Sequence, residues 1–125
     1  MQTWRRQLAQ TARENSLVLS TVAGCLETND VPRRIITEAR RILMAVSGRA
    51  MSSHDYLSFK RAVPVTEAVG EVLQKVMRCL GEGTFDALTI EDRTQFQRIA
   101  GEYRCYAARV YHSHICCVNS QCSCD

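Results

Sequence analysis

Sulfur and imidazole side chains gather at the end of the 125-residue chain. Five of its seven cysteines and two of its three histidines lie between Cys105 and Asp125. Thiolates and imidazoles suit a soft or borderline metal ion such as Zn²⁺, which takes four nitrogen or sulfur ligands in a tetrahedron. Zn²⁺ is therefore the one cofactor that the sequence suggests. The expected ligands are His112, Cys116, Cys122 and Cys124, with Cys105, His114 and Cys117 as alternates.

The spacing of these residues fits a helix but is not diagnostic of a metal site. Cys105, His112 and Cys116 are seven and four residues apart and would share one stripe of a helix that continues to Cys116. Two C-x-x-C pairs, the strongest zinc pattern, are absent. Three alternatives stay open: unliganded thiols packed on the bundle, disulfides, and acylation of the adjacent Cys116 and Cys117.

Four arginines form the second group that could bind a partner. On a helical wheel of about 100° per residue they occupy the side opposite the apolar residues of their segment. Such a face can contact phosphates of RNA or DNA, or an acidic protein surface. The alternative is an ordinary solvated helix face. The four residues are Arg33, Arg34, Arg40 and Arg41.

No arrangement of side chains indicates catalysis, and we expect that the protein is not an enzyme. The serines, cysteines and histidines match no nucleophile signature. Glu67 and Glu71 are four residues apart, but like charges at that spacing usually lie in solvent. No glycine-rich phosphate loop is present.

The segments that must position these groups are helical. Apolar residues recur three, four and seven positions apart, and no stretch alternates as a strand would. We therefore expect an all-α fold, a single compact bundle of about five helices at residues 1–115 that carries a Cys/His-rich C-terminal tail at 116–125. The helices are expected at about 3–27, 32–47, 52–63, 64–80 and from 89 into the tail.

Helix ends are marked by local signals. Ser52 or Ser53 is expected to cap the third helix, and Pro64 should stop it near Val63. Thr89 and Asp92 resemble a capping box in which aspartate replaces the usual Glu or Gln. Gly48 is expected to close the second helix, and Gly81 and Gly83 the fourth.

The apolar pattern predicts which aromatic residues lie in the core and which lie at its rim. Trp4 falls on the apolar stripe of the first helix and is expected to anchor the bundle. Tyr103 matches the stripe of the last helix, whereas Tyr106 and Tyr111 suit half-buried positions. Asn15 interrupts the first stripe.

Composition limits the class of protein. The chain is 46% hydrophobic with a formal charge of +3 and has neither a secretory pattern nor an apolar run of about 18 residues, so a membrane role is not expected. We expect an intracellular protein, cytoplasmic or nuclear; Arg5, Arg6 and Arg13 make a mitochondrial presequence the minor alternative.

The expected function is a small helical protein-interaction or regulatory module that binds a protein partner or forms a homodimer, with a C-terminal zinc site as an additional stabiliser. The alternative is binding to a nucleic-acid backbone through the arginine-rich second helix.

Overall fold

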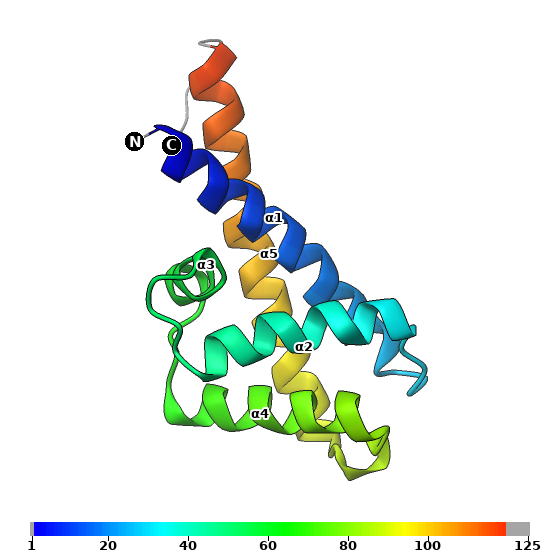
Figure 1. Cartoon of the computed structure of the whole chain (residues 1–125). Coiled ribbons are helices and arrows are strands. Elements are labelled where there is room, and N and C mark those ends of the chain that lie inside the picture. The colour runs from blue at the N-terminus through cyan, green and yellow to red at the C-terminus, as the bar shows by residue number, and fades with distance from the viewer. Residues whose placement is uncertain (1, 120–125) are drawn as a thin grey trace.

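The chain is all-α over the part that the structure describes. A computed structural model gives the backbone of residues 2–119 and the side chains of residues 3–112. No strand occurs within these limits, and none of the described helices is long and apolar enough to cross a membrane. The elements shown in Figure 1 are α1 (Gln2–Cys25), α2 (Arg33–Ser47), α3 (His54–Ala62), α4 (Glu67–Glu82), the 3-10 turn η1 (Phe85–Ala87) and α5 (Ile90–Asn119).

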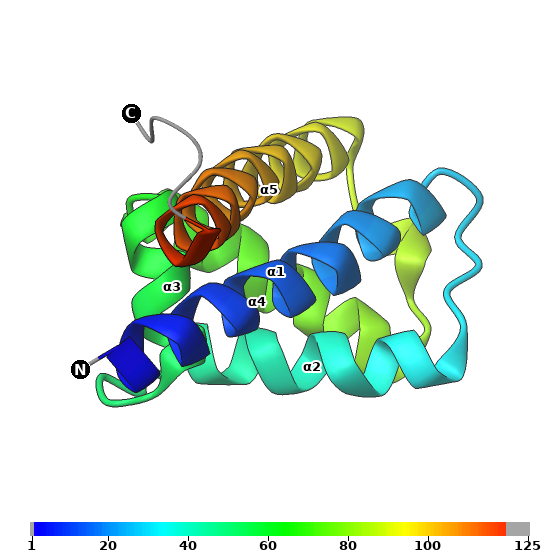
Figure 2. The ribbon, with the colours of Figure 1, turned by 90° about the horizontal axis from the view of Figure 1, so that it is seen from above.

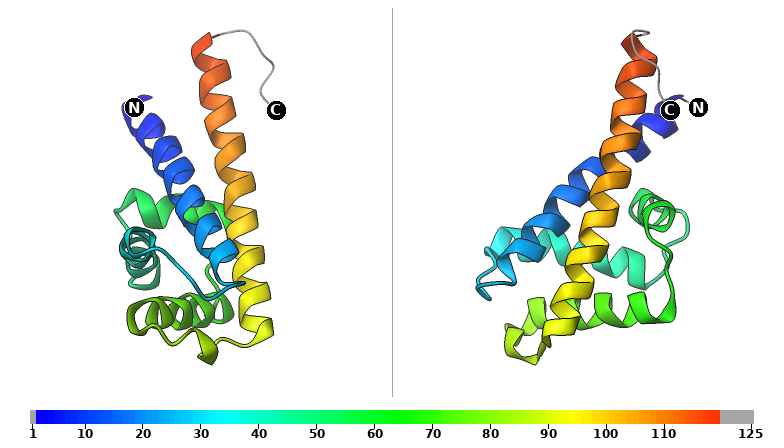
Figure 3. Two further views of the ribbon diagram at one scale, coloured as in Figure 1. Left: turned by 90° about the vertical axis from the view of Figure 1, so that its right-hand side faces the viewer. Right: turned by 180° about the vertical axis from the view of Figure 1, so that it is seen from behind.

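The two longest helices, α1 and α5, form the main packing interface and cross each other (Figure 3). Seen from above, α1 lies between α5 and α2 (Figure 2). α2 and α4 lie side by side and run in opposite directions (Figure 1). The short α3 contacts α1, α2 and α5. Each α-helix contributes fully buried side chains to one core, among them Leu19, Ile42, Phe59, Leu73 and Phe96.

The starts of α3 and α5 follow the expected capping chemistry, whereas α2 has Pro32 at its N-cap and no side-chain cap. The Ser53 hydroxyl accepts a hydrogen bond from the Tyr56 N–H at 3.1 Å, and α3 ends before Val63 as expected. Thr89 and Asp92 form the reciprocal capping box, with backbone-to-side-chain distances of 2.9 and 3.0 Å. The hydrogen bond from Lys75 to Asp92, 2.6 Å from Nζ to Oδ2, is the main cause that lowers the pKa of Asp92. The Asp92 carboxylate therefore caps the start of α5 and also binds Lys75 of α4.

Gly48 is the C-cap of α2, as expected, but the left-handed residue is the one that follows it. The Arg49 N–H bonds to the Val46 carbonyl at 3.1 Å, and the Ala50 N–H bonds to the Ala45 carbonyl at 3.0 Å, which is the Schellman pattern. In this pattern the left-handed residue is the one after Gly48. Gly48 keeps φ −78°, and Arg49 takes φ 52°. A bulky side chain thus occupies the position that favours glycine.

The start of α4 and the place of Gly81 differ from the expectation, whereas Gly83 ends the helix as expected. α4 begins at Glu67, with Thr66 as its N-cap, and not directly after Pro64. Gly81 lies inside α4, and Gly83 ends it with φ 72°. The Thr66 hydroxyl accepts from the Val69 N–H at 3.2 Å, which places the first helical residue after the cap.

The aromatic and polar expectations have mixed outcomes. Tyr103 is fully buried as expected, and its hydroxyl lies 2.7 Å from that of Ser58. Trp4 is not a core anchor, because 41% of it is exposed at the α1/α3 border, where Arg61 lies over its ring. Asn15 is buried and donates to Asp55 at 2.7 Å, so the polar break in the stripe is a specific contact to α3.

Arg93 of α5 joins segments that are distant in sequence, and sequence inspection did not identify it. Its Nη2 donates to the Phe85 carbonyl at 2.6 Å and its Nη1 to Asn29 Oδ1 at 2.7 Å. Nη1 also donates to the Leu26 carbonyl, and Nε donates to the Leu88 carbonyl at 3.3 Å. One guanidinium therefore donates hydrogen bonds both to acceptors that follow the end of α1 and to carbonyl groups at the turn η1.

Candidate functional site

The four arginines of α2 are all exposed, but their surroundings differ. Arg41 forms two ion pairs, at 3.3 Å to Glu38 and at 3.2 Å to Asp55 of α3. Asp55 also accepts from Asn15 of α1, so Arg41 belongs to a polar chain that links three helices. The Arg41 charge is therefore already paired with carboxylates of the same molecule.

Arg40 packs across α4. Its Cζ lies 2.9 Å from the point that a Cβ would occupy at Gly81, so the missing side chain makes room for the guanidinium. Arg33 and Arg34 form no ion pair with any described residue. Of the predicted arginine face, these two side chains are the ones least engaged by the fold.

The predicted metal site lies mostly outside the described residues. Cys105 and His112 are exposed on α5, and the helix continues to Asn119, as the spacing of positions 105, 112 and 116 requires. Within the described part of the chain, no group of three His, Cys, Asp or Glu side chains is placed to hold a metal ion. The remaining predicted ligands, Cys116, Cys122 and Cys124 with the alternates His114 and Cys117, have no described side chains, so the zinc site stays a prediction.

A groove of about 430 Å³ runs between α1 and α5. Its volume is within the range of about 300–1,000 Å³ that is common for binding pockets. Leu17 lines it and is 58% exposed, while Ser16 and Ala107, which also line it, are buried. We call this the α1/α5 groove; its residues are Arg13, Ser16, Leu17, Arg104, Ala107, Ala108, Tyr111 and His112.

The charge on the α1/α5 groove is positive. Arg13 lies over the Tyr111 ring, with its Cζ 4.6 Å from the ring centroid, and its Nη1 donates to Tyr111 Oη at 3.3 Å. Neither Arg13 nor Arg104 forms an ion pair with a described residue, and none of the described residues that line the groove carries a carboxylate. The surface thus combines apolar area with two cationic groups that the described residues do not neutralise.

Sequence inspection missed this groove, although a signal was present. Leu17 lies off the apolar stripe that buries Ala12, Leu19 and Val22. A large apolar residue on the polar side of a helix is a sign of a surface that contacts something else. That α5 would bring Arg104 and Tyr111 next to Leu17 depends on the crossing of two distant helices.

Comparison with known proteins gives no relative: no family model, no curated protein and no solved structure matches the chain.

Proposed function

We propose that this chain is a protein-interaction module that receives an acidic amphipathic helix in the α1/α5 groove. The observation that supports this most is that exposed Leu17 lies beside the guanidiniums of Arg13 and Arg104 in a groove to which the described residues contribute no carboxylate. An amphipathic helix docks by placing apolar side chains into such a groove, while its charged residues meet the rim. Acidic residues are the complement that these two arginines require.

The contacts of the groove suggest how the partner would be held. Leu17 and Ala108 offer exposed apolar surface, and the small Ala108 allows another helix to approach closely. The Tyr111 ring and hydroxyl hold Arg13 in place, so less side-chain entropy is lost when a carboxylate binds it. A bound helix would thus pack as a third member against α1 and α5.

Two synthetic peptides of about 18 residues, long enough for about five turns, test the proposal. One has leucines three and four residues apart with glutamate elsewhere, and the other has lysine in place of glutamate. We expect the acidic peptide to bind with a Kd of about 10 µM in fluorescence anisotropy and to weaken as salt rises. The lysine peptide should not bind.

Leu17→Glu should weaken binding of the acidic peptide at least about tenfold, because it places a like charge in the apolar wall. Met44→Glu is the matched control: Met44 of α2 is 59% exposed, as Leu17 is 58%, but it lies outside the groove. Equal binding of both peptides, or equal loss in both variants, would contradict the proposal. Self-association that Leu17→Glu abolishes would instead identify a second copy of the chain as the occupant.

A further inference from the structure

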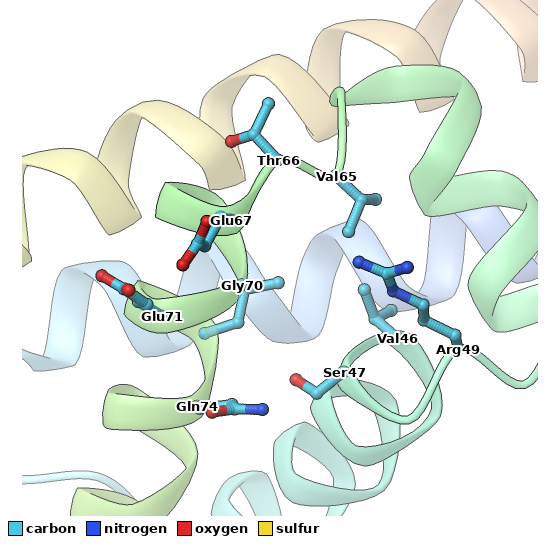
Figure 4. Close-up of a pocket in the computed structure, with 10 residues that line it drawn as sticks. Val46, Ser47, Arg49, Val65, Thr66, Glu67, Gly70, Glu71 and Gln74 are labelled. Atoms are coloured by element: carbon cyan, nitrogen blue, oxygen red, sulfur yellow. The ribbon is translucent and has the colours of Figure 1, made fainter.

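A second, smaller cavity lies where the end of α2 meets the start of α4 (Figure 4). Its volume is about 230 Å³. At the roughly 30 Å³ that each water occupies in the liquid, it would hold about seven or eight waters. This volume suits a ligand of about ten non-hydrogen atoms and is too small for a protein side-chain cluster or a nucleotide.

At three positions that line this cavity, a simple substitution is expected to make the folded protein more stable than the residue present does. The Ser47 hydroxyl is buried, and the described residues give it no hydrogen-bond partner. Arg49 holds φ 52°, a conformation that costs a residue with a Cβ about 1 kcal/mol or more. Gly70 lies inside α4, although a Cβ there would meet nothing within 4 Å. Ala, Gly and Ala would suit these positions better.

The three residues come from two different elements yet line one cavity. Departures from local preference that converge on one place are typical of binding sites, because there the side chains are set by the ligand as well as by the fold. In Figure 4 Ser47 and Arg49 lie on one side of the pocket and Gly70 on the other, and a Cβ at Gly70 would meet only open space.

The charges around the cavity are opposite on its two sides. Arg49 lies on the α2 side, and the carboxylates of Glu67 and Glu71 lie on the α4 side (Figure 4). Arg49 forms no ion pair with any described residue, so these opposite charges do not neutralise each other directly. Val65 supplies partly exposed apolar surface between them, and the fully buried Val46 and Leu73 lie behind it.

We propose that this cavity binds a small zwitterion, an α-amino acid with an aliphatic side chain. Its carboxylate would pair with the Arg49 guanidinium, its ammonium group with Glu67 or Glu71, and its side chain would cover Val65. L-leucine, with about nine non-hydrogen atoms, matches the volume.

Titration of the ¹⁵N-labelled full chain with L-leucine, followed by amide chemical shifts, tests the proposal. We expect a Kd of about 0.1–1 mM and shifts at Ser47, Arg49 and Gly70 but not at Leu17. Two half-ligands, 4-methylpentanoate without the ammonium group and 3-methylbutan-1-amine without the carboxylate, should each bind at least about tenfold more weakly.

Arg49→Ala should weaken L-leucine binding at least about tenfold, whereas Arg34→Ala, which removes an exposed arginine at the far end of α2, should leave it unchanged. Gly70→Val, which fills the cavity, should abolish binding; far-ultraviolet circular dichroism checks that each variant is folded. The proposal is overturned by an absence of shifts at about 20 mM L-leucine, at which a site of this strength is nearly saturated. Equal affinity for a half-ligand and for L-leucine would show that the opposite charges do not act together, and would also overturn it.

Discussion

Replacing Ser47 by Ala, Arg49 by Gly and Gly70 by Ala should stabilise the protein while removing its small-ligand site. Ser47→Ala removes a buried hydroxyl that has no partner among the described residues, a gain of about 1 kcal/mol. Arg49→Gly relieves φ 52°, a gain of about 1 kcal/mol. Gly70→Ala replaces a helix-interior glycine in open space, worth about 1 kcal/mol. The triple variant should therefore be more stable by about 3 kcal/mol.

This increase in the free energy of unfolding should appear as a higher melting temperature. Unfolding entropy is about 2.1 cal/mol/K per residue, which gives about 0.26 kcal/mol/K for 125 residues. A gain of about 3 kcal/mol should raise the Tm by roughly 10 °C in calorimetry. Because the three positions are close together, the single variants are measured as well, so that coupling among them is visible.

Gly101→Ala is the matched control. Gly101 lies inside α5, has nothing within 4 Å of its Cβ position and does not line the cavity. It should gain about 1 kcal/mol like Gly70→Ala, but L-leucine should bind the Gly101→Ala protein as it binds the wild type. If Ser47→Ala, Arg49→Gly and Gly70→Ala are each neutral or destabilising, these residues serve the fold itself, and the reasoning that connects them to a ligand is wrong.

Four further predictions follow from other parts of the chain. Arg93→Ala should destabilise the protein by about 3 kcal/mol in urea unfolding, because four acceptors lose a charged donor, whereas Arg98→Ala, which breaks one exposed 3.9 Å ion pair, should cost less than about 0.5 kcal/mol. A similar cost in both variants would contradict this role of Arg93. Burial raises the pKa of Tyr103 from 10.0 to about 12. The neutral phenol therefore contributes fully to stability below about pH 10, and this contribution is lost as the pH rises through about 12. Relative to Tyr103→Phe, the free energy of unfolding of the wild type should fall by about 2 kcal/mol between about pH 9 and pH 12. Parallel curves of unfolding free energy against pH for the two proteins would refute this. If the α2 face binds duplex RNA, affinity should fall steeply with salt, and Arg33→Glu with Arg34→Glu should weaken it for every sequence, whereas binding that ignores salt excludes phosphate contacts. If the C-terminal cysteines and histidines hold Zn²⁺, the native mass should exceed the denatured mass by one zinc ion that a chelator removes; equal masses would exclude the site.

The helices could be predicted from the sequence because their signals are local. Apolar spacing identifies each helix, and a cap depends on residues three positions apart, as in the Thr89–Asp92 pair. Pro64 similarly acts on the residue directly before it, where α3 has already ended. Each of these effects works within about one turn of helix, so no knowledge of the packing was needed.

The features that depend on packing could not be predicted in this way. The four acceptors of Arg93 come from residues between Leu26 and Leu88, and only the fold brings them to one guanidinium. The interpretation of the α2 face also changes, since Arg41 is paired with Asp55, fourteen residues away. Reversing the charge of Arg41 would thus disturb the fold, and Arg33 and Arg34 are the better positions to test contacts with a polyanion.

Two buried polar side chains have hydrogen-bond partners inside the molecule, and one buried hydroxyl has none among the described residues. Asn15 departs from the apolar stripe of α1, yet its amide donates to Asp55 at 2.7 Å. Ser58 is fully buried, and its hydroxyl lies 2.7 Å from that of Tyr103. Both have partners inside the molecule, so stability and uniqueness of packing explain them. Ser47 as a whole is only half-buried, but its hydroxyl oxygen is buried without such a partner among the described residues, and the residue lines a cavity. Because a buried hydroxyl without a partner costs about 1–3 kcal/mol, the residue that the fold does not explain is the one that points to a ligand.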